Sequence, residues 1–180
     1  MIDNILNDHE FNKIMQSNTG CAIIMAGSDS DLPHIEKIIK SLDSWEIPYR
    51  TVIKSAHKQD VEETIKGLNK IGGSYALIAV AGGTDALSGQ ASFHSHAPVI
   101  SCPPDQEKYY NGINESCLRN PPGSSNAYVA RPDNVGKFIA QMYAGLNQRF
   151  NELLVKSNED KIMKLEEKGT IIYGSHRSGN

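Results

Sequence analysis

Short apolar runs alternate along the chain with stretches of helical periodicity. The runs have the length of strands, and we predict strands at residues 21–26, 48–53, 75–81, 98–102 and, as a short fifth, 127–130. Between the first three runs, apolar residues recur every three or four positions, from Leu32 to Leu42 and from Val61 to Leu68. This alternation predicts an α/β fold with a central parallel sheet and helices on both faces.

The C-terminal third of the chain predicts one long helix. Asp133 suits an N-cap, and apolar residues follow at helical spacing from Val135 to Leu154. Such a helix is longer than one small sheet can cover, so we expect its far end to pack on another subunit; the alternative is that it folds back onto its own domain. We divide the chain into an N-terminal extension (1–20), an α/β domain that includes this helix (21–156) and a polar C-terminal tail (157–180).

Composition and charge are those of an ordinary globular protein. Apolar residues make up 39% of the 180 positions and the net charge is −3, with no stripe of basic residues, which argues against a nucleic-acid partner. No apolar run is long enough to cross a bilayer. The first 20 residues are polar and lack the apolar segment of a signal peptide. We therefore expect a cytoplasmic protein without a membrane partner.

Loops that follow the first three strands carry the candidate chemistry. The first strand runs into Gly27-Ser28-Asp29-Ser30-Asp31 and then into a helix. Gly27 lets the backbone approach a ligand, while serine hydroxyls and the free N–H groups of a helix start can bind an anion. One of the two carboxylates then suits ribose hydroxyls. The alternative interpretation is that Ser30 or Asp31 only caps the helix.

The second loop, Ser55-Ala56-His57-Lys58, carries a hydroxyl, an imidazole and an ammonium. His57 can transfer a proton near neutral pH, Lys58 can hold a phosphate, and the small Ala56 leaves room for a ligand ring. The third strand ends in Ala81-Gly82-Gly83-Thr84-Asp85-Ala86-Leu87. Because ligands of open α/β sheets bind at the carboxyl ends of the strands, we expect the three loops to line one crevice.

The cysteines and the remaining histidines indicate no further chemistry. Cys21, Cys102 and Cys117 are widely spaced and have no base beside them in the sequence, so we expect them to pack in the interior. His94 and His96 have a spacing found in metal sites, but no carboxylate or cysteine cluster accompanies them, and we predict no metal. Surface positions are predicted for His9, His34 and His176, which have polar neighbours.

Four motifs, in this order and spacing, resemble the PurE family of purine biosynthesis from about residue 21 to residue 146. They are Gly27-Ser28-Asp29-Ser30-Asp31, Ser55-Ala56-His57-Lys58, Ala79-Val80-Ala81-Gly82 with Leu87-Ser88-Gly89, and Pro98-Val99-Ile100-Ser101-Cys102-Pro103-Pro104. Lys58 after the histidine, together with the run from Ser116 to Gly123, resembles class II members. Those enzymes carboxylate aminoimidazole ribonucleotide directly with carbon dioxide, whereas class I members carry arginine after the histidine and rearrange the N5-carboxylated isomer.

The resemblance implies a flavodoxin-like three-layer α/β/α sandwich with a long C-terminal helix, assembled as an octamer or tetramer. It implies a small-molecule substrate and no metal, biotin or ATP, and it assigns the proton transfer to His57. With the three loops it gives this set of substrate-binding candidates: Gly27, Ser28, Ser30, Asp31, Ser55, Ala56, Lys58, Ala81, Gly82, Gly83, Asp85 and Leu87.

The chain departs from the family pattern in the third loop. Class II members carry Arg-Ser-Asn where this chain has Gly83-Thr84-Asp85, so a cation is lost and an anion is gained. The main hypothesis is a carboxylase acting on aminoimidazole ribonucleotide. The alternatives are the class I mutase and a ribonucleotide-binding homologue without carboxylase activity, since function resides in the site and not in the fold.

Overall fold

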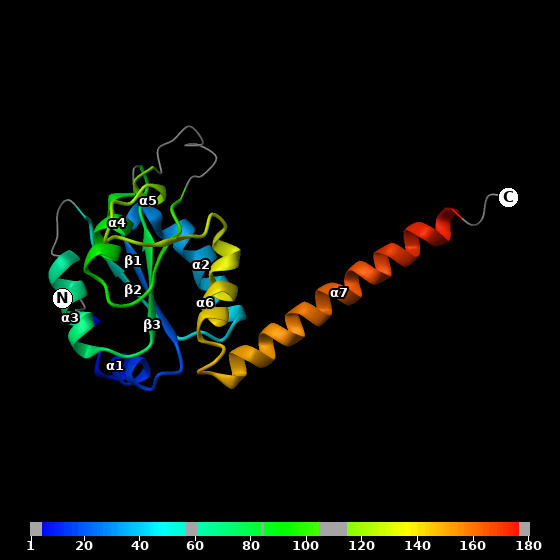
Figure 1. The fold of residues 1–180 in the computed structure, drawn as a ribbon, viewed down its shortest axis with the longest axis horizontal. Helices are drawn as coiled ribbons and strands as arrows, with labels where there is room; N and C mark the ends of the chain where they lie inside the picture. The colour runs from blue at the N-terminus through cyan, green and yellow to red at the C-terminus, as the bar shows by residue number, and fades with distance from the viewer. Residues whose placement is uncertain (1–4, 57–60, 84, 105–114, 177–180) are drawn as a thin grey trace.

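A five-stranded parallel sheet forms the middle layer of the protein (Figure 1). The computed structural model describes residues 5–56, 61–83, 85–104 and 115–176. The strands lie in the order β2-β1-β3-β4-β5, which is the order of flavodoxin-like folds. Their bounds confirm the five predicted strands: β1 (Cys21–Ala26), β2 (Tyr49–Ile53), β3 (Tyr75–Val80), β4 (Val99–Ser101) and β5 (Ala127–Tyr128).

Helices cover both faces of the sheet and confirm the predicted sandwich. One face carries α2 (Leu32–Ser44), α6 (Val135–Tyr143) and the start of α7 (Gln148–His176). The other carries α1 (His9–Gln16), α3 (Val61–Ile71) and α4 (Ala86–His94), and the short α5 (Glu115–Leu118) lies beside α4. Because side chains alternate along a strand, β1 sends Ala22, Ile24 and Ala26 into the first core and Cys21, Ile23 and Met25 into the second.

The single helix predicted from Asp133 to Leu154 is two helices. Asp133 lies in a 3₁₀ turn before α6, and α6 ends at Tyr143. Gly145 interrupts the pattern, and the Asn147 side chain then accepts a hydrogen bond from the backbone N–H of Arg149, 3.0 Å away, at the start of α7. The break turns the chain, so that α7 leaves the domain as a separate element (Figure 1).

The predicted N-terminal extension and the predicted C-terminal tail are both largely helical over the residues that the structure describes. Within the predicted N-terminal extension, Phe11 and Met15 of α1 are fully buried, and the Asp8 carboxylate accepts a 2.6 Å hydrogen bond from Arg50 of β2. At the other end, α7 runs across the boundary that we placed after Lys156. The division into three units therefore stays a prediction. Among the described residues, no helix combines the length and apolar character that crossing a membrane requires.

Candidate functional site

The described residues form a cleft of about 260 Å³ at the carboxyl ends of β1, β2 and β3. The chain crosses from β1 to β2 on one side and reaches β3 on the other, so the strand order reverses here, as at ligand sites of open α/β sheets. The size is close to the lower end of small-molecule sites, roughly 300 Å³. Its lining residues are Gly27, Ser28, Ser30, Asp31, Ser55, Ala56, Ala81, Gly82, Ala86 and Leu87.

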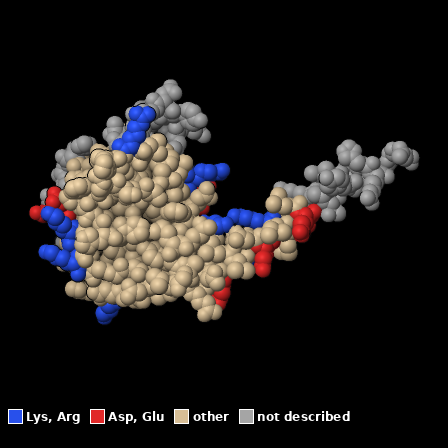
Figure 2. Space-filling view, in the orientation of Figure 1, with Lys and Arg blue, Asp and Glu red and all other residues tan. Residues whose placement is uncertain are grey.

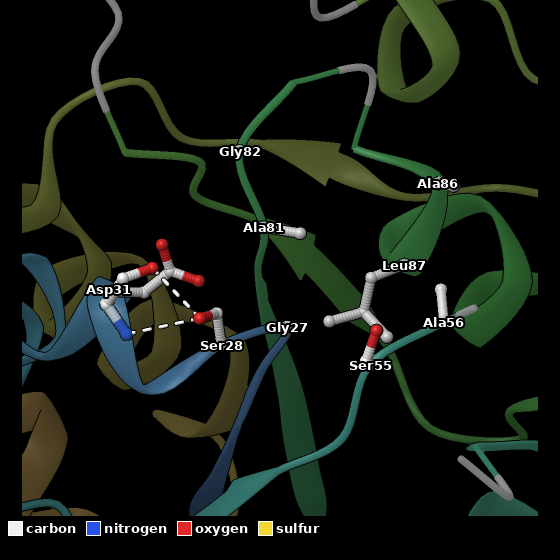
Figure 3. A pocket seen from close by; sticks show the side chains of 10 residues that line it. Gly27, Ser28, Asp31, Ser55, Ala56, Ala81, Gly82, Ala86 and Leu87 are labelled. Carbon is white, nitrogen blue, oxygen red and sulfur yellow. Dashed lines mark hydrogen bonds between the residues drawn. The ribbon is translucent and has the colours of Figure 1, made fainter. Parts of the chain in front are cut away.

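The first loop presents hydroxyl groups to the cleft. Ser28 is the N-cap of the 3₁₀ turn Asp29–Asp31, and its hydroxyl oxygen accepts hydrogen bonds from the Ser30 backbone N–H at 3.2 Å and from the Ser30 hydroxyl at 2.9 Å (Figure 3). Gly27 lies next to β3, since a Cβ there would come to 3.4 Å from the Ala81 Cβ, and its backbone N–H donates to the Val80 carbonyl at 2.8 Å. The alternative interpretation named Ser30 or Asp31 as the helix cap, but the capping side chain is that of Ser28, and Asp31 makes no side-chain cap hydrogen bond to α2.

The second loop borders the opposite side of Gly27, where Figure 3 shows Ser55 and Ala56 beside Leu87. The Lys54 backbone N–H donates to the Ala26 carbonyl at 2.7 Å, so the end of β2 stays attached to β1 and positions Ser55. His57 and Lys58, the predicted proton carrier and phosphate ligand, lie outside the described residues, but they directly follow the cleft residue Ala56.

The third loop contributes Ala81, Gly82 and Leu87 to the cleft as expected, whereas Gly83 and Asp85 are not among its lining residues. Gly83 has a φ of +64°, a left-handed conformation that suits glycine. Sequence reasoning missed Ala86, which does line the cleft. The run of small residues before Leu87 was the available signal, because a helix that begins beside a ligand needs a small side chain there.

Asp85 is fully buried and does not line the cleft. It caps α4, since its carboxylate accepts a 3.2 Å hydrogen bond from the Ser88 backbone N–H and another from the Ser101 hydroxyl of β4. Burial raises the pKa of this carboxyl above its ordinary value, and the bonds from Ser101 and Ser88 offset part of that effect. Asp85 thus ties the third loop to the sheet.

The cysteines are buried as predicted. Burial raises the pKa of the Cys21 and Cys102 thiols to about 12 each, which keeps them protonated near neutral pH and disfavours a nucleophilic role. Cys117 is also buried. The described residues contain no group of three or more His, Cys, Asp or Glu side chains that is placed to hold a metal ion.

The surface position predicted for His34 is wrong. This residue of the first turn of α2 is half-buried, and its Nε2 lies 3.0 Å from the Cys102 carbonyl oxygen. This contact could not be predicted from the local sequence pattern, because the two residues are 68 positions apart. His94, by contrast, is a neighbour of Glu62, with 3.8 Å between its Nε2 and the carboxylate.

Comparison with known proteins identifies similar chains over most of this length. A protein-family model described as AIR carboxylase matches residues 21–164. A phosphoribosylaminoimidazole carboxylase of Treponema denticola is 31% identical over 151 residues, which cover 81% of this chain and 95% of that protein. A probable N5-carboxyaminoimidazole ribonucleotide mutase of Methanobrevibacter smithii is 30% identical over 161 residues, or 80% of this chain and 47% of that protein. The crystal structure of Treponema denticola PurE has a TM-score of 0.78 and 29% identity, and the match covers 84% of this chain and 97% of that one.

Proposed function

This chain belongs to the AIR carboxylase family, and from that premise we propose that it carboxylates 5-aminoimidazole ribonucleotide with carbon dioxide in purine biosynthesis. The product is 4-carboxy-5-aminoimidazole ribonucleotide. The observation that carries the proposal is the cleft at the switch point of the sheet, where the serine loop, the Ser55-Ala56 end of β2 and the Gly82 loop come together.

The reaction needs few groups from the protein. The aminoimidazole is an enamine, so its C4 attacks the carbon of carbon dioxide, and a C4–carbon bond forms as one carbon–oxygen double bond opens to give the carboxylate. The C4 proton then leaves and the ring regains aromaticity. A water-poor cleft with backbone N–H groups stabilises the growing carboxylate, and one positioned base accepts the proton.

The cleft residues suit these tasks in three groups. In our proposal, Ser28, Ser30 and Ser55 with Lys58 bind the phosphate, and Asp31 binds the ribose. Gly27, Ala56, Ala81 and Gly82 have little or no side chain, so ring and carboxylate can approach the backbone, and Leu87 packs beside them. His57 accepts the C4 proton. Gly83 and Asp85 shape the third loop and do not contact the substrate.

The decisive experiment compares two substrates with the purified protein. Carboxylation of 5-aminoimidazole ribonucleotide in bicarbonate buffer, without ATP, is the expected result. The similarity to a probable mutase favours one alternative, in which only the N5-carboxylated isomer is converted. Binding of the ribonucleotide without conversion of either substrate would identify a homologue that has lost catalysis. Decarboxylation of the product gives an independent readout of the same step.

Lys58→Ala is expected to weaken ribonucleotide binding about tenfold or more, because a hydrogen bond to a charged group contributes roughly 1.5–3 kcal/mol. Calorimetry with the ribonucleotide and with its phosphate-free nucleoside measures the effect. Only the ribonucleotide should bind more weakly. The control is Lys40→Ala on the exposed side of α2, which should bind both ligands as the parent does. Equal weakening for both ligands would assign Lys58 another role.

We also propose that the protein is a homo-oligomer, an octamer or tetramer as the family resemblance implies. Val155, Ile162 and Leu165 share one side of α7 by their spacing, and they are 50%, 55% and 68% exposed. The helix projects from the domain at that point (Figure 1), and charged side chains of both signs are visible along it (Figure 2). A second copy of the chain would cover this apolar stripe.

Light scattering at micromolar concentration is expected to give a multiple of the 19.7 kDa chain mass. Ile162→Lys with Leu165→Lys should lower the mass, because two charges would be buried in the interface. Asp160→Lys is the control on the opposite side of α7 and should leave the mass unchanged. A parent protein with the mass of one chain would contradict the proposal.

The cytoplasm is the compartment that we propose for this reaction. Its substrate and product are phosphorylated and charged, so neither crosses a bilayer unaided. The proposal names no nucleic-acid or membrane partner, in line with the net charge of −3.

A further inference from the structure

His34 connects the start of α2, next to the cleft, with the residue that follows β4, which is 68 positions away in the sequence. It lies in the first turn of α2, three residues after Asp31, which lines the cleft. Its Nε2 is 3.0 Å from the carbonyl oxygen of Cys102 and 3.6 Å from the Cys102 sulfur. A carbonyl oxygen can only accept, so Nε2 carries a hydrogen and donates it.

The Cys102 carbonyl is a group that needs such a donor. The Cys102 backbone N–H donates to Ala79 at 3.0 Å, and the preceding carbonyl, that of Ser101, accepts from Val129 at 2.9 Å. The register of β4 with β5 ends at Ser101, and the next residue, Cys102, is fully buried. An unpaired carbonyl in such a place is costly, and two prolines follow that offer no N–H of their own.

Residues 102–104 form a strap that reaches the third loop. Pro103 and Pro104 are buried, and the Pro104 ring lies 3.9 Å from the point where a Cβ on Gly82 would be. Gly82 lines the cleft. A continuous series of contacts therefore runs from the first loop through α2 and His34 to the strap, and from the strap to the backbone of the third loop.

We propose that His34 is a positioning residue for the carboxylation. Its Nε2–H holds the Cys102–Pro104 strap against Gly82 and so fixes the third loop relative to the Ser28–Asp31 loop. The inference rests on the proposed function, because it assigns Gly82 to the reacting end of the substrate. A misplacement of about 1 Å at such a point can lower a rate about 100-fold.

Substitution of His34 by asparagine or by glutamine distinguishes this positioning role from a role in proton transfer. Glutamine places an amide nitrogen near the position of Nε2, whereas asparagine reaches only the position of Nδ1. The neutral Nε2–H tautomer and the imidazolium both donate this hydrogen bond, so the role needs no change of protonation. The His34→Gln variant should therefore keep most of the parent's activity and show the same pH profile. A proton carrier at this position would not tolerate glutamine.

The experiment measures kcat and KM for parent, His34→Ala, His34→Asn and His34→Gln, with Lys37→Ala of the same helix as the exposed control. Each kcat is divided by the number of ribonucleotide sites counted by calorimetry, so that a smaller folded fraction does not imitate a slower site. We expect kcat to fall about tenfold or more for alanine and asparagine, with KM changed less than about threefold. Glutamine and the Lys37 control should stay within about threefold of the parent.

Equal kcat per site for alanine and parent would overturn the inference, as would loss of activity in His34→Gln. If the alanine variant does not fold, the contrast between asparagine and glutamine decides alone. A parent that binds the ribonucleotide without turning it over would also overturn the inference, because His34 is proposed to position the loop for the carboxylation and not to hold the ligand. A parent that neither binds nor converts the ribonucleotide contradicts the proposed function itself, and the His34 inference is then overturned with it.

Discussion

His57→Asn is expected to lower carboxylation about 100-fold or more, which is the usual contribution of a positioned general base. His57 directly follows Ser55 and Ala56, which line the cleft, and in our proposal it accepts the C4 proton. Asparagine retains polarity and part of the volume but cannot accept the C4 proton. Turnover should fall, whereas ribonucleotide affinity should stay close to that of the parent.

The measurement combines initial rates in bicarbonate buffer with calorimetric binding of the ribonucleotide. His96→Asn is the matched control, because it makes the same change at an exposed histidine remote from the cleft-lining residues. Turnover near the parent level in His57→Asn would exclude this histidine as the proton carrier. A parallel loss of binding would instead show that His57 mainly holds the ligand.

The middle of the sheet was predictable because the strands β1 and β3 are buried on both faces. Continuous apolar runs such as 21–26 and 75–80 have this character, and all residues of β1 and β3 are buried. Small and polar residues directly after these strands predicted the cleft, since strand ends of a parallel sheet share one edge. The apolar runs in the sequence coincide with the buried central strands of the sheet, which is why the strands were predicted correctly.

Features that depend on distant contacts could not be predicted in the same way. The α1 helix is polar overall, and only its packing under the sheet shows why Phe11 and Met15 are apolar. His34 has polar neighbours in sequence, and its partner carbonyl lies on another strand end. The third loop carries Asp85 where the family pattern has asparagine, but the sequence does not reveal on which side of the loop the carboxylate lies.

Asp85→Asn is expected to stabilise the protein at high pH. Asparagine caps helices about as well as aspartate and tolerates the left-handed conformation of this residue, whose φ is 51°. Its amide oxygen can accept from the Ser88 N–H, and its NH₂ can donate to the Ser101 hydroxyl, which then turns from donor to acceptor. The main change is therefore the loss of a buried carboxylate.

The pH dependence of this gain in stability follows from the raised pKa of Asp85, whose largest cause is burial. The folded state holds the proton to a higher pH than the unfolded chain does, so stability falls as pH rises from about 4, the usual pKa of aspartate, through the folded-state pKa. Each unit of that increase corresponds to about 1.4 kcal/mol. The gain from Asp85→Asn should thus be smallest near pH 4 and largest at pH 8.

Asp85→Ala separates charge from hydrogen bonding at the same position. Alanine removes the cap of α4, a loss of about 1 kcal/mol, and leaves the buried Ser101 hydroxyl without this acceptor, a loss of roughly 1–3 kcal/mol. We expect a melting temperature about 5–15 °C below that of the parent near pH 5, given roughly 2–4 °C per kcal/mol for a chain of this size. Thermal melts of the three proteins from pH 4 to pH 8, with carboxylation rates beside them, test the argument.

Turnover should be kept or raised in the asparagine variant, because the carboxylate faces Ser88 and Ser101 and not the cleft. A lower melting temperature at pH 8 for Asp85→Asn would mean that the ionised carboxylate stabilises the third loop, and the role assigned to its burial would be wrong.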